Sequence, residues 1–151
     1  MNEGAVMSFI EWNVNLYTGL PDVDQQHNKL VALANRLTEV SGDDPEVLDQ
    51  AFLQLQDYVI EHFTLEERLM DEAQIDPDHI KYHKNAHALF VEKIAELWAT
   101  RDSSDQQTLN DMLEFLKSWI LQHILQTDRI MAGKLHDKLG TEAPHNMFTH
   151  F

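Results

Sequence analysis

The stretch HFTLEERLMDEAQIDPDHIKYHKNAHALF, residues 62–90, decides the fold of this chain. It holds two pairs of polar residues spaced four apart, on either side of an Asp-Pro break at residues 76–77. Residues four apart share one face of an α-helix, and Asp followed by Pro is typical of a helix start. The stretch therefore predicts two consecutive helices, each with a polar pair set among apolar residues. The pairs are His62 with Glu66 and His83 with His87.

Apolar residues at helical spacing continue outward from this stretch in both directions. They predict four long helices, at about residues 24–40, 44–73, 76–100 and 104–131. Short connections between long helices imply that neighbouring helices run antiparallel. The predicted fold class is all-α, an antiparallel up-down-up-down four-helix bundle over residues 24–131.

The two ends of the chain are predicted to lie outside this bundle. Residues 1–23 are expected to form an N-terminal arm across it, and residues 132–151 a short C-terminal tail that could include a short helix. At 151 residues the chain is long enough to bury a sizeable core, so we expect residues 1–151 to be a single domain.

The composition excludes several classes of function. Asp and Glu number 26 against 11 Lys and Arg, and the resulting net charge of −15 repels nucleic acid and anionic lipid. The chain has no cysteine, which excludes disulfides, thiolate zinc sites and iron–sulfur clusters. We see no signal peptide and no apolar run of transmembrane length. A soluble cytoplasmic protein, with neither nucleic acid nor membrane as a partner, is expected.

Five histidines and two carboxylates are candidate metal ligands, because each is set in apolar sequence where an unpaired polar group is costly to bury. Metal ligation removes that cost. A single pair could equally belong to a polar stripe on a solvated face, but four predicted helices each offer a histidine flanked by apolar residues. The candidates are His27, His62, Glu66, His83, His87, His123 and Asp128.

The ligand types narrow the choice of metal. Seven groups exceed the four ligands of a structural zinc ion, and five imidazoles are too nitrogen-rich for magnesium or calcium. Two first-row metal ions bridged by the carboxylates would use all seven groups. The ferritin-like di-iron class is disfavoured, because its Glu-x-x-His motif occurs here once, from Glu142 to His145, with Pro144 inside it.

Taken together, these motifs resemble the bacterial hemerythrin family over roughly residues 12–131. The resemblance implies a non-haem di-iron centre with a solvent-derived oxo or hydroxo bridge. It implies that His83, His87 and His123 bind one iron and that His27 and His62 bind the other, with Glu66 and Asp128 bridging. The matching segments are Trp12, TG at 18–19, DVDQQH at 22–27, HFTLEERLM at 62–70, HKNAHALF at 83–90 and WILQHILQTD at 119–128.

The function implied by the resemblance is reversible O2 binding at the open position of the five-coordinate iron, for storage, delivery or scavenging, without catalysis. One alternative is an oxygen- or redox-sensing domain of a signalling protein, although such sensors usually carry an output or membrane domain. Another is a di-iron oxidase, peroxidase or nitric oxide handler. For that class we find no obvious substrate pocket and no general acid beyond Tyr58.

The remaining polar residues near the motifs are assigned mainly by position. His79, in the first turn after Pro77, is predicted to be exposed or to cap the helix. Tyr58 could face the site or be a half-buried core aromatic, and Gln126, if it pointed inward, would favour faster autoxidation. The other histidines belong to the tail and are expected to be solvated; they are His136, His145 and His150.

One spacing does not suit a regular helix. His123 and Asp128 are five residues apart, which corresponds to about 500° of rotation and leaves them about 140° apart around an α-helix. Both must face the same metal pair if they are ligands. We therefore predict a π-type turn or an overlong hydrogen bond between Ile120 and Asp128.

Overall fold

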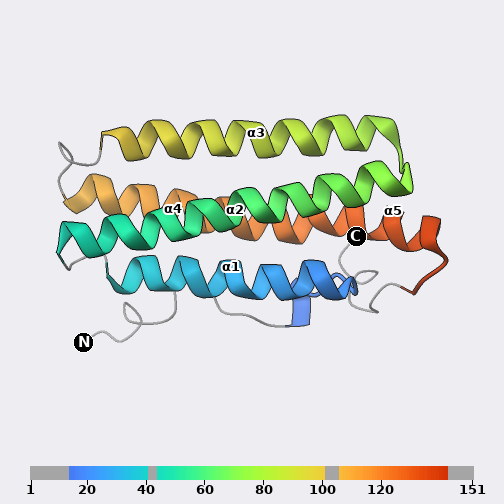
Figure 1. The fold of residues 1–151 in the computed structure, drawn as a ribbon, viewed down its shortest axis with the longest axis horizontal. Coiled ribbons are helices and arrows are strands. Elements are labelled where there is room, and N and C mark those ends of the chain that lie inside the picture. Colours follow the sequence, from blue (N-terminus) through green and yellow to red (C-terminus); the bar gives the residue numbers. More distant parts are fainter. Residues whose placement is uncertain (1–13, 41–43, 101–105, 143–151) are drawn as a thin grey trace.

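The computed structural model describes residues 14–40, 44–100 and 106–142, and these contain helices and no strand. Four long helices lie side by side, and the direction of the chain reverses from each to the next (Figure 1). The predicted antiparallel four-helix bundle is confirmed. In order, the elements are a 3₁₀ turn (Val14–Leu16), α1 (Pro21–Glu39), α2 (Pro45–Ala73), α3 (Pro77–Ala99), α4 (Gln106–Gln122), a π-helical turn (His123–Asp128) and α5 (Arg129–Leu139).

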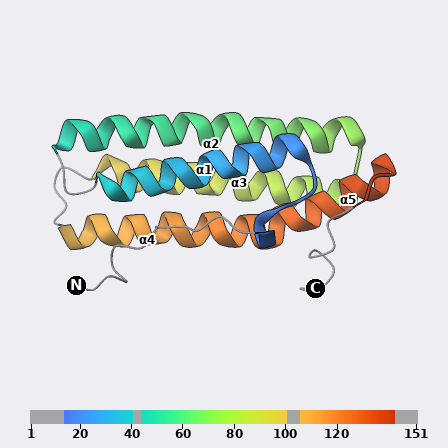
Figure 2. The same ribbon diagram turned by 90° about the horizontal axis from the view of Figure 1, so that it is seen from below.

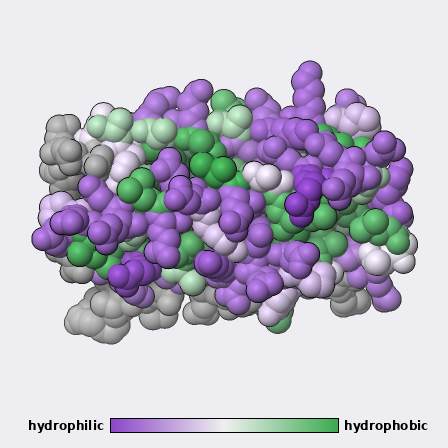
Figure 3. All heavy atoms as spheres, viewed as in Figure 1, coloured by the Kyte–Doolittle hydropathy of each residue, from purple (hydrophilic) through white to green (hydrophobic). Residues whose placement is uncertain are grey.

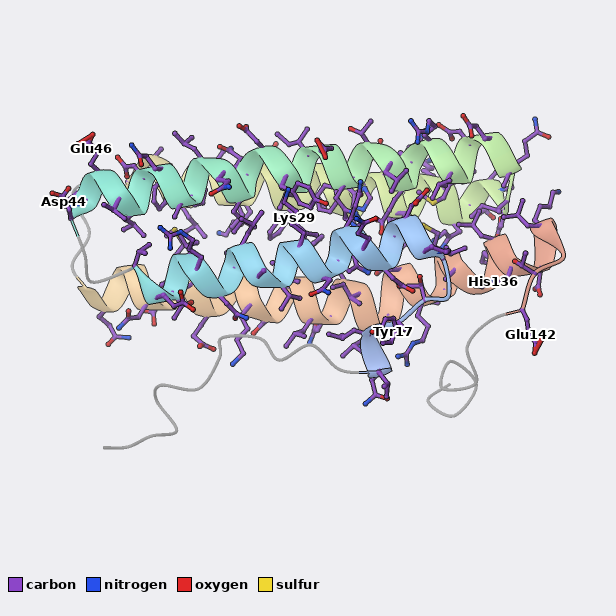
Figure 4. The ribbon with its side chains drawn as sticks, turned by 60° about the horizontal axis from the view of Figure 1, so that its bottom comes forward. Tyr17, Lys29, Asp44, Glu46, His136 and Glu142 are labelled. Atoms are coloured by element: carbon purple, nitrogen blue, oxygen red, sulfur yellow. The ribbon has the colours of Figure 1, made fainter. Side chains whose placement is uncertain are left out.

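Proline sets the start of three helices. The carboxylates of Asp44 and Asp76 accept hydrogen bonds from the backbone N–H groups of Glu46 (2.8 Å) and Asp78 (3.0 Å), so each caps the helix that its following proline begins. Asp44 and Glu46 lie together at the first turn of α2 (Figure 4). These two starts agree with the sequence prediction.

The first helix begins earlier than predicted, at Pro21 instead of Asp24. Asp24 lies in its first turn, and its carboxylate accepts hydrogen bonds from the backbone N–H groups of Thr18 (2.7 Å) and Gly19 (3.0 Å). The carboxylate therefore holds the turn that leads into the helix. The predicted position of residues 1–13 across the bundle falls outside the described residues.

The last helix runs further than predicted. α4, the π turn and α5 follow one another without a break, and α5 ends only at Leu139, where Gly140 takes a left-handed conformation with φ of 72°. The predicted helix end near Met131 is therefore wrong. Figure 2 shows α4 and α5 as one long rod beneath α1 and α3.

Buried apolar residues form two clusters, and the helices carry polar residues between them. On α1, His27 lies between Val23 of the smaller cluster and Leu30 of the larger one. On the last rod, Asp128 lies between Ile124 and Met131 in the same way. The bundle thus contains a buried polar layer between two apolar parts. The smaller cluster consists of Val23, Leu65, Met70, Ile75, Met131 and Leu135.

The face of the molecule in Figure 3 is mostly hydrophilic, in keeping with the net charge of −15. Apolar side chains are scattered among the polar ones there. None of the helices in the described part of the chain combines the length and the apolar composition that a membrane span requires.

Candidate metal centre

The structure brings the seven candidate ligands together in the buried polar layer. Each is at most 6% exposed. α1 contributes one, and α2, α3 and the π turn contribute two each. Every long helix of the bundle therefore takes part in the site. In chain order the residues are His27, His62, Glu66, His83, His87, His123 and Asp128.

These residues form two overlapping groups that could each hold a metal ion. In each group the nearest ligand atoms all lie within 4.8 Å of one another. Glu66 and Asp128 belong to both groups, and the histidines divide three to two between them. The three-histidine group contains His83, His87 and His123, and the two-histidine group contains His27 and His62.

The two oxygens of Glu66 face opposite groups. Oε2 lies 2.9 Å from Nε2 of His62 and 3.2 Å from Nε2 of His27. Oε1 lies 3.3 Å from Nε2 of His83 and 3.2 Å from Nε2 of His87. One carboxylate thus presents one oxygen to each group.

Asp128 repeats this arrangement. Its Oδ2 lies 2.9 Å from Nε2 of His27, in the two-histidine group. Its Oδ1 lies 3.0 Å from Nε2 of His83 and 3.0 Å from Nε2 of His123, in the three-histidine group. Both carboxylates therefore present one oxygen to each group of histidines.

Several buried polar atoms of these residues make no regular hydrogen bond with the described residues, although some lie close to an imidazole or carboxylate of the same site. Buried donors and acceptors are rarely left unpaired, because each costs about 1–3 kcal/mol. Lone pairs of imidazole and carboxylate that converge without a donor are what metal ions use. The residues present therefore fit a pair of metal ions. The unpartnered atoms are His27 Nδ1, His62 Nε2, Glu66 Oε1, His83 Nε2 and both carboxylate oxygens of Asp128.

The electrostatics of the metal-free site show strong coupling between imidazoles and carboxylates. Burial by itself lowers the pKa of His27, but its close contacts with the carboxylates of Asp128 and Glu66 and their charges outweigh it and raise the pKa to about 10. The same opposition raises the pKa of His83 to about 9. Burial tends to raise the pKa values of the two carboxyls, yet the surrounding histidines hold both well below their usual range. In the metal-free site, protons on His27 and His83 therefore supply the positive charge that balances the two carboxylates.

A π-helical turn places the last two candidate ligands on the same side of their helix. It spans His123–Asp128, with regular α-helix on both sides. The predicted π turn between Ile120 and Asp128 is confirmed. Because the wider turn adds a residue to each hydrogen-bonded ring, residues five apart come into line.

A small cavity adjoins the two-histidine group. About 10 Å³ of it is open to the centre of a water molecule, which is about the least that a single water molecule requires. His27, His62, His123 and Asp128 form its polar side. Its other walls are Leu30, Val59, Phe63, Phe90, Trp119, Ile120 and Ile124.

Residues 18–135 match the hemerythrin HHE cation-binding domain. The chain belongs to the hemerythrin family. The resemblance found in the sequence motifs is confirmed.

Relatives of this hemerythrin-family chain cover most of its length. The bacteriohemerythrin of Pseudomonas aeruginosa is 28% identical over 123 residues, 81% of this chain and 78% of that protein. The bacteriohemerythrin of Clostridium acetobutylicum is 28% identical over 124 residues, 78% of this chain and 95% of that protein. A crystal structure of a hemerythrin mutant superimposes with a TM-score of 0.74 at 23% identity, over 85% of this chain and 98% of that one. This similarity supports the shared fold.

Three histidines of the hemerythrin site have a partner behind the ring. Nδ1 of His62 donates to the amide oxygen of Gln26 (2.8 Å), and Nδ1 of His87 donates to the carboxylate of Glu67 (3.0 Å). The third partner is His79, whose Nε2 lies 3.0 Å from Nδ1 of His83. Such contacts fix ring orientation and tautomer.

The prediction that His79 is exposed or caps α3 is wrong: its side chain is 8% exposed and bonded to His83. Burial, with the charges of His83 and Lys134, lowers its pKa to about 4. The sequence did contain a signal for this contact, because His79 precedes His83 by four residues.

The prediction that His136 is solvated is also wrong. The residue is buried on α5, where Nε2 donates to the backbone oxygen of Thr18 (2.9 Å) and Nδ1 pairs with Oγ1 of Thr141 (2.7 Å). Figure 4 shows it where α5 passes the segment that precedes α1. His145 and His150 fall outside the described residues.

Two open assignments are resolved. Tyr58 is a partly buried aromatic packed on the larger core cluster, and Nζ of Lys29 lies 4.6 Å from the centre of its ring. Lys29 sits on the side of α1 that faces α2 (Figure 4). Tyr58 is absent from the residues lining the small cavity. Gln126 is exposed and is absent from the residues that line the small cavity.

Proposed function

We propose that this protein reversibly binds O2 at two non-haem iron ions bridged by Glu66 and Asp128. The observation that carries the proposal is the sharing of both carboxylates between two groups of histidines. His83, His87 and His123 would hold one iron, and His27 and His62 the other. A solvent-derived oxo or hydroxo group would complete the bridge. Membership of the hemerythrin family supports this assignment.

Bound iron would supply electrons to O2 and recover them when O2 leaves. The side chains balance the charge of the site: two ferrous ions, two carboxylates and one hydroxide leave a net charge of +1. Five imidazoles and the groups behind three of them would spread that charge. Gln26, Glu67 and His79 hold the rings in the tautomer that directs Nε2 inward.

The apolar cavity supports O2 as the ligand. It touches both groups, through His27 and His62 of one and His123 of the other, and its volume is about what one water molecule needs. Side chains such as Phe63, Trp119 and Ile124 form its walls and would exclude water from the site. Water exclusion matters because protons that reach the reduced oxygen would allow it to leave as peroxide. The iron would then remain ferric and could not bind O2 again.

The same cavity supports a role without catalysis. Among the residues described, those that line it include no titratable side chain besides the proposed ligands. A general acid or base would have to reach the substrate from such a position. We infer a carrier or store of O2, and the acidic, cysteine-free composition supports a cytoplasmic location as part of the same proposal.

Metal analysis and optical spectroscopy test the proposal together. The protein reconstituted with ferrous iron under argon should contain two iron ions per chain, one for each group. Adding O2 should produce a visible absorption band that disappears on return to argon. A preparation with less than one iron per chain, or with no oxygen-dependent band, would overturn the proposal. Sustained turnover of added peroxide would favour an enzyme instead.

A further inference from the structure

The histidines of the proposed iron site differ in what lies behind them. His62 donates to a neutral amide and His87 to a carboxylate, whereas Nδ1 of His27 has no partner among the described residues. His83 alone among these has another imidazole behind it, that of His79. We propose that His79 is a positioning residue, which orients His83 and sets how strongly that ring donates to iron.

This inference rests on the proposed function. If His83 binds iron, the hydrogen bond between His83 and His79 can run in only one direction. Nε2 of His83 faces inward, 3.0 Å from Oδ1 of Asp128 and 3.3 Å from Oε1 of Glu66. A ring that binds metal through Nε2 carries its proton on Nδ1. The Nδ1–H group of His83 then donates to Nε2 of His79, which accepts only as a neutral imidazole.

The position of His79 makes this contact stable. It lies one turn before His83 on α3, and the two rings are nearly perpendicular, at 89°, with centroids 5.1 Å apart. A perpendicular approach lets the N–H of one ring point at the nitrogen lone pair of the other. His79 is 8% exposed, so water competes little for the bond.

The chemistry of the acceptor determines the effect on the metal. A donor N–H bonded to an acceptor makes the opposite nitrogen a stronger base, and a carboxylate does so more than a neutral acceptor. His87, backed by Glu67, would be the strongest donor of the three-histidine group. His83, backed by a neutral ring, would donate less strongly. Removing the acceptor would weaken the bond from His83 to iron and stabilise ferrous over ferric iron.

Four variants separate this role from simple packing. His79→Leu fills the space without an acceptor, and His79→Asn keeps a polar group that is too short to reach His83. His79→Gln places an amide oxygen close to the position of Nε2. Tyr82→Phe is the control, because Tyr82 is 61% exposed and its ring lies 6.3 Å from that of His79. Metal stoichiometry, iron midpoint potential and the rate of iron loss to a chelator would be measured for each.

We expect the parent, Tyr82→Phe and His79→Gln to release iron at similar rates and to share one midpoint potential. His79→Leu and His79→Asn should release iron about 10 to 100 times faster, with a raised midpoint potential. In zinc-loaded protein, the slowly exchanging Nδ1 proton of His83 should be seen by NMR in the parent and His79→Gln and be lost in His79→Leu.

Equal behaviour of Leu and Gln variants in a protein that binds two metal ions would overturn this inference and leave the proposed function standing. Failure of the parent itself to bind two metal ions would overturn the proposed function. The two failures are therefore distinguishable.

Discussion

Nε2 of His123 lies 3.0 Å from Oδ1 of Asp128, although five residues separate them along one helix. In a regular α-helix these side chains would point about 140° apart. The chain widens into a π turn only from His123 to Asp128 and is α-helical before and after it. Widened turns of this kind gather at functional sites, and here the turn serves the geometry of the proposed bridge.

Deleting Gln126 should convert the π turn into regular α-helix with His123 and Asp128 four residues apart, so that both still share one face and α5 keeps its position against the bundle. Met131 and Leu135, both essentially inaccessible to solvent, should therefore remain in the smaller cluster. We expect the free energy of unfolding in urea denaturation to change by less than about 3 kcal/mol and metal binding to persist, and loss of metal binding would contradict this register. Gln126→Ala keeps the chain length at an exposed position and should change stability by less than about 0.5 kcal/mol.

The long helices and all seven inward-facing residues could be predicted from the sequence, because helical periodicity and Asp-Pro starts are local signals. The π turn could also be predicted, because His123 and Asp128 are five residues apart, whereas residues on one face of a regular α-helix are three or four apart. The surroundings of His79 could not. α5 continues past Met131, and its Lys134 pairs with Asp76 at 3.5 Å and lies near enough to His79 to lower its pKa. Whether a helix continues past Gly133 depends on tertiary packing, which no local pattern reports.

Replacing either of the two carboxylates proposed to bridge the metal ions should remove metal binding almost completely. Glu66→Ala or Asp128→Ala would leave the two cations with less negative charge and without a shared ligand, so iron per chain should fall well below two. Glu67→Gln, one residue away on α2, is the matched control, because it changes only the acceptor behind His87. It should retain two iron ions and lose about 10- to 100-fold in affinity. Full occupancy in Glu66→Ala would contradict the bridging role.

The stability of the metal-free protein should be greatest near pH 6.5. His27 and His83 have folded-state pKa values of about 10 and 9, above the ordinary 6.5, so their contribution is complete below pH 6.5 and is lost as pH rises through 9 to 10. His79 acts in the opposite sense, because its pKa is lowered to about 4 and its contribution is lost as pH falls from 6.5.

Urea denaturation of chelator-treated protein across pH 4 to 10 measures this directly. A protein that binds metal should show a weaker decline on the alkaline side, because neutral imidazoles then coordinate instead of binding protons. Metal uptake near neutral pH should also release protons, which a weakly buffered indicator would detect. Constant stability of the metal-free protein between pH 7 and 10 would contradict the raised pKa values of His27 and His83.

Ile124→Ala should admit water to the cavity beside the site. The side chain is 3% exposed and forms part of the cavity wall. We expect the free energy of unfolding to fall by about 2–5 kcal/mol, and the oxygen-dependent absorption band to decay faster as ferric iron accumulates. Gln126→Leu should leave the decay rate unchanged, since that side chain is exposed. An unaltered decay rate in Ile124→Ala would mean that this wall does not exclude water.

His136→Leu should lower stability without affecting metal binding. The ring joins the end of α5 to the segment before α1 through its bonds to the backbone oxygen of Thr18 and to Oγ1 of Thr141. Leucine leaves the buried carbonyl of Thr18 without its donor, at a cost of about 1–3 kcal/mol. Thr141→Val removes the second bond alone and should cost less, because Thr141 is exposed. Both variants should bind as much iron as the parent, since neither residue lies in the metal groups. Loss of iron in His136→Leu at full helical content would show that the contact at this end of the bundle also shapes the site.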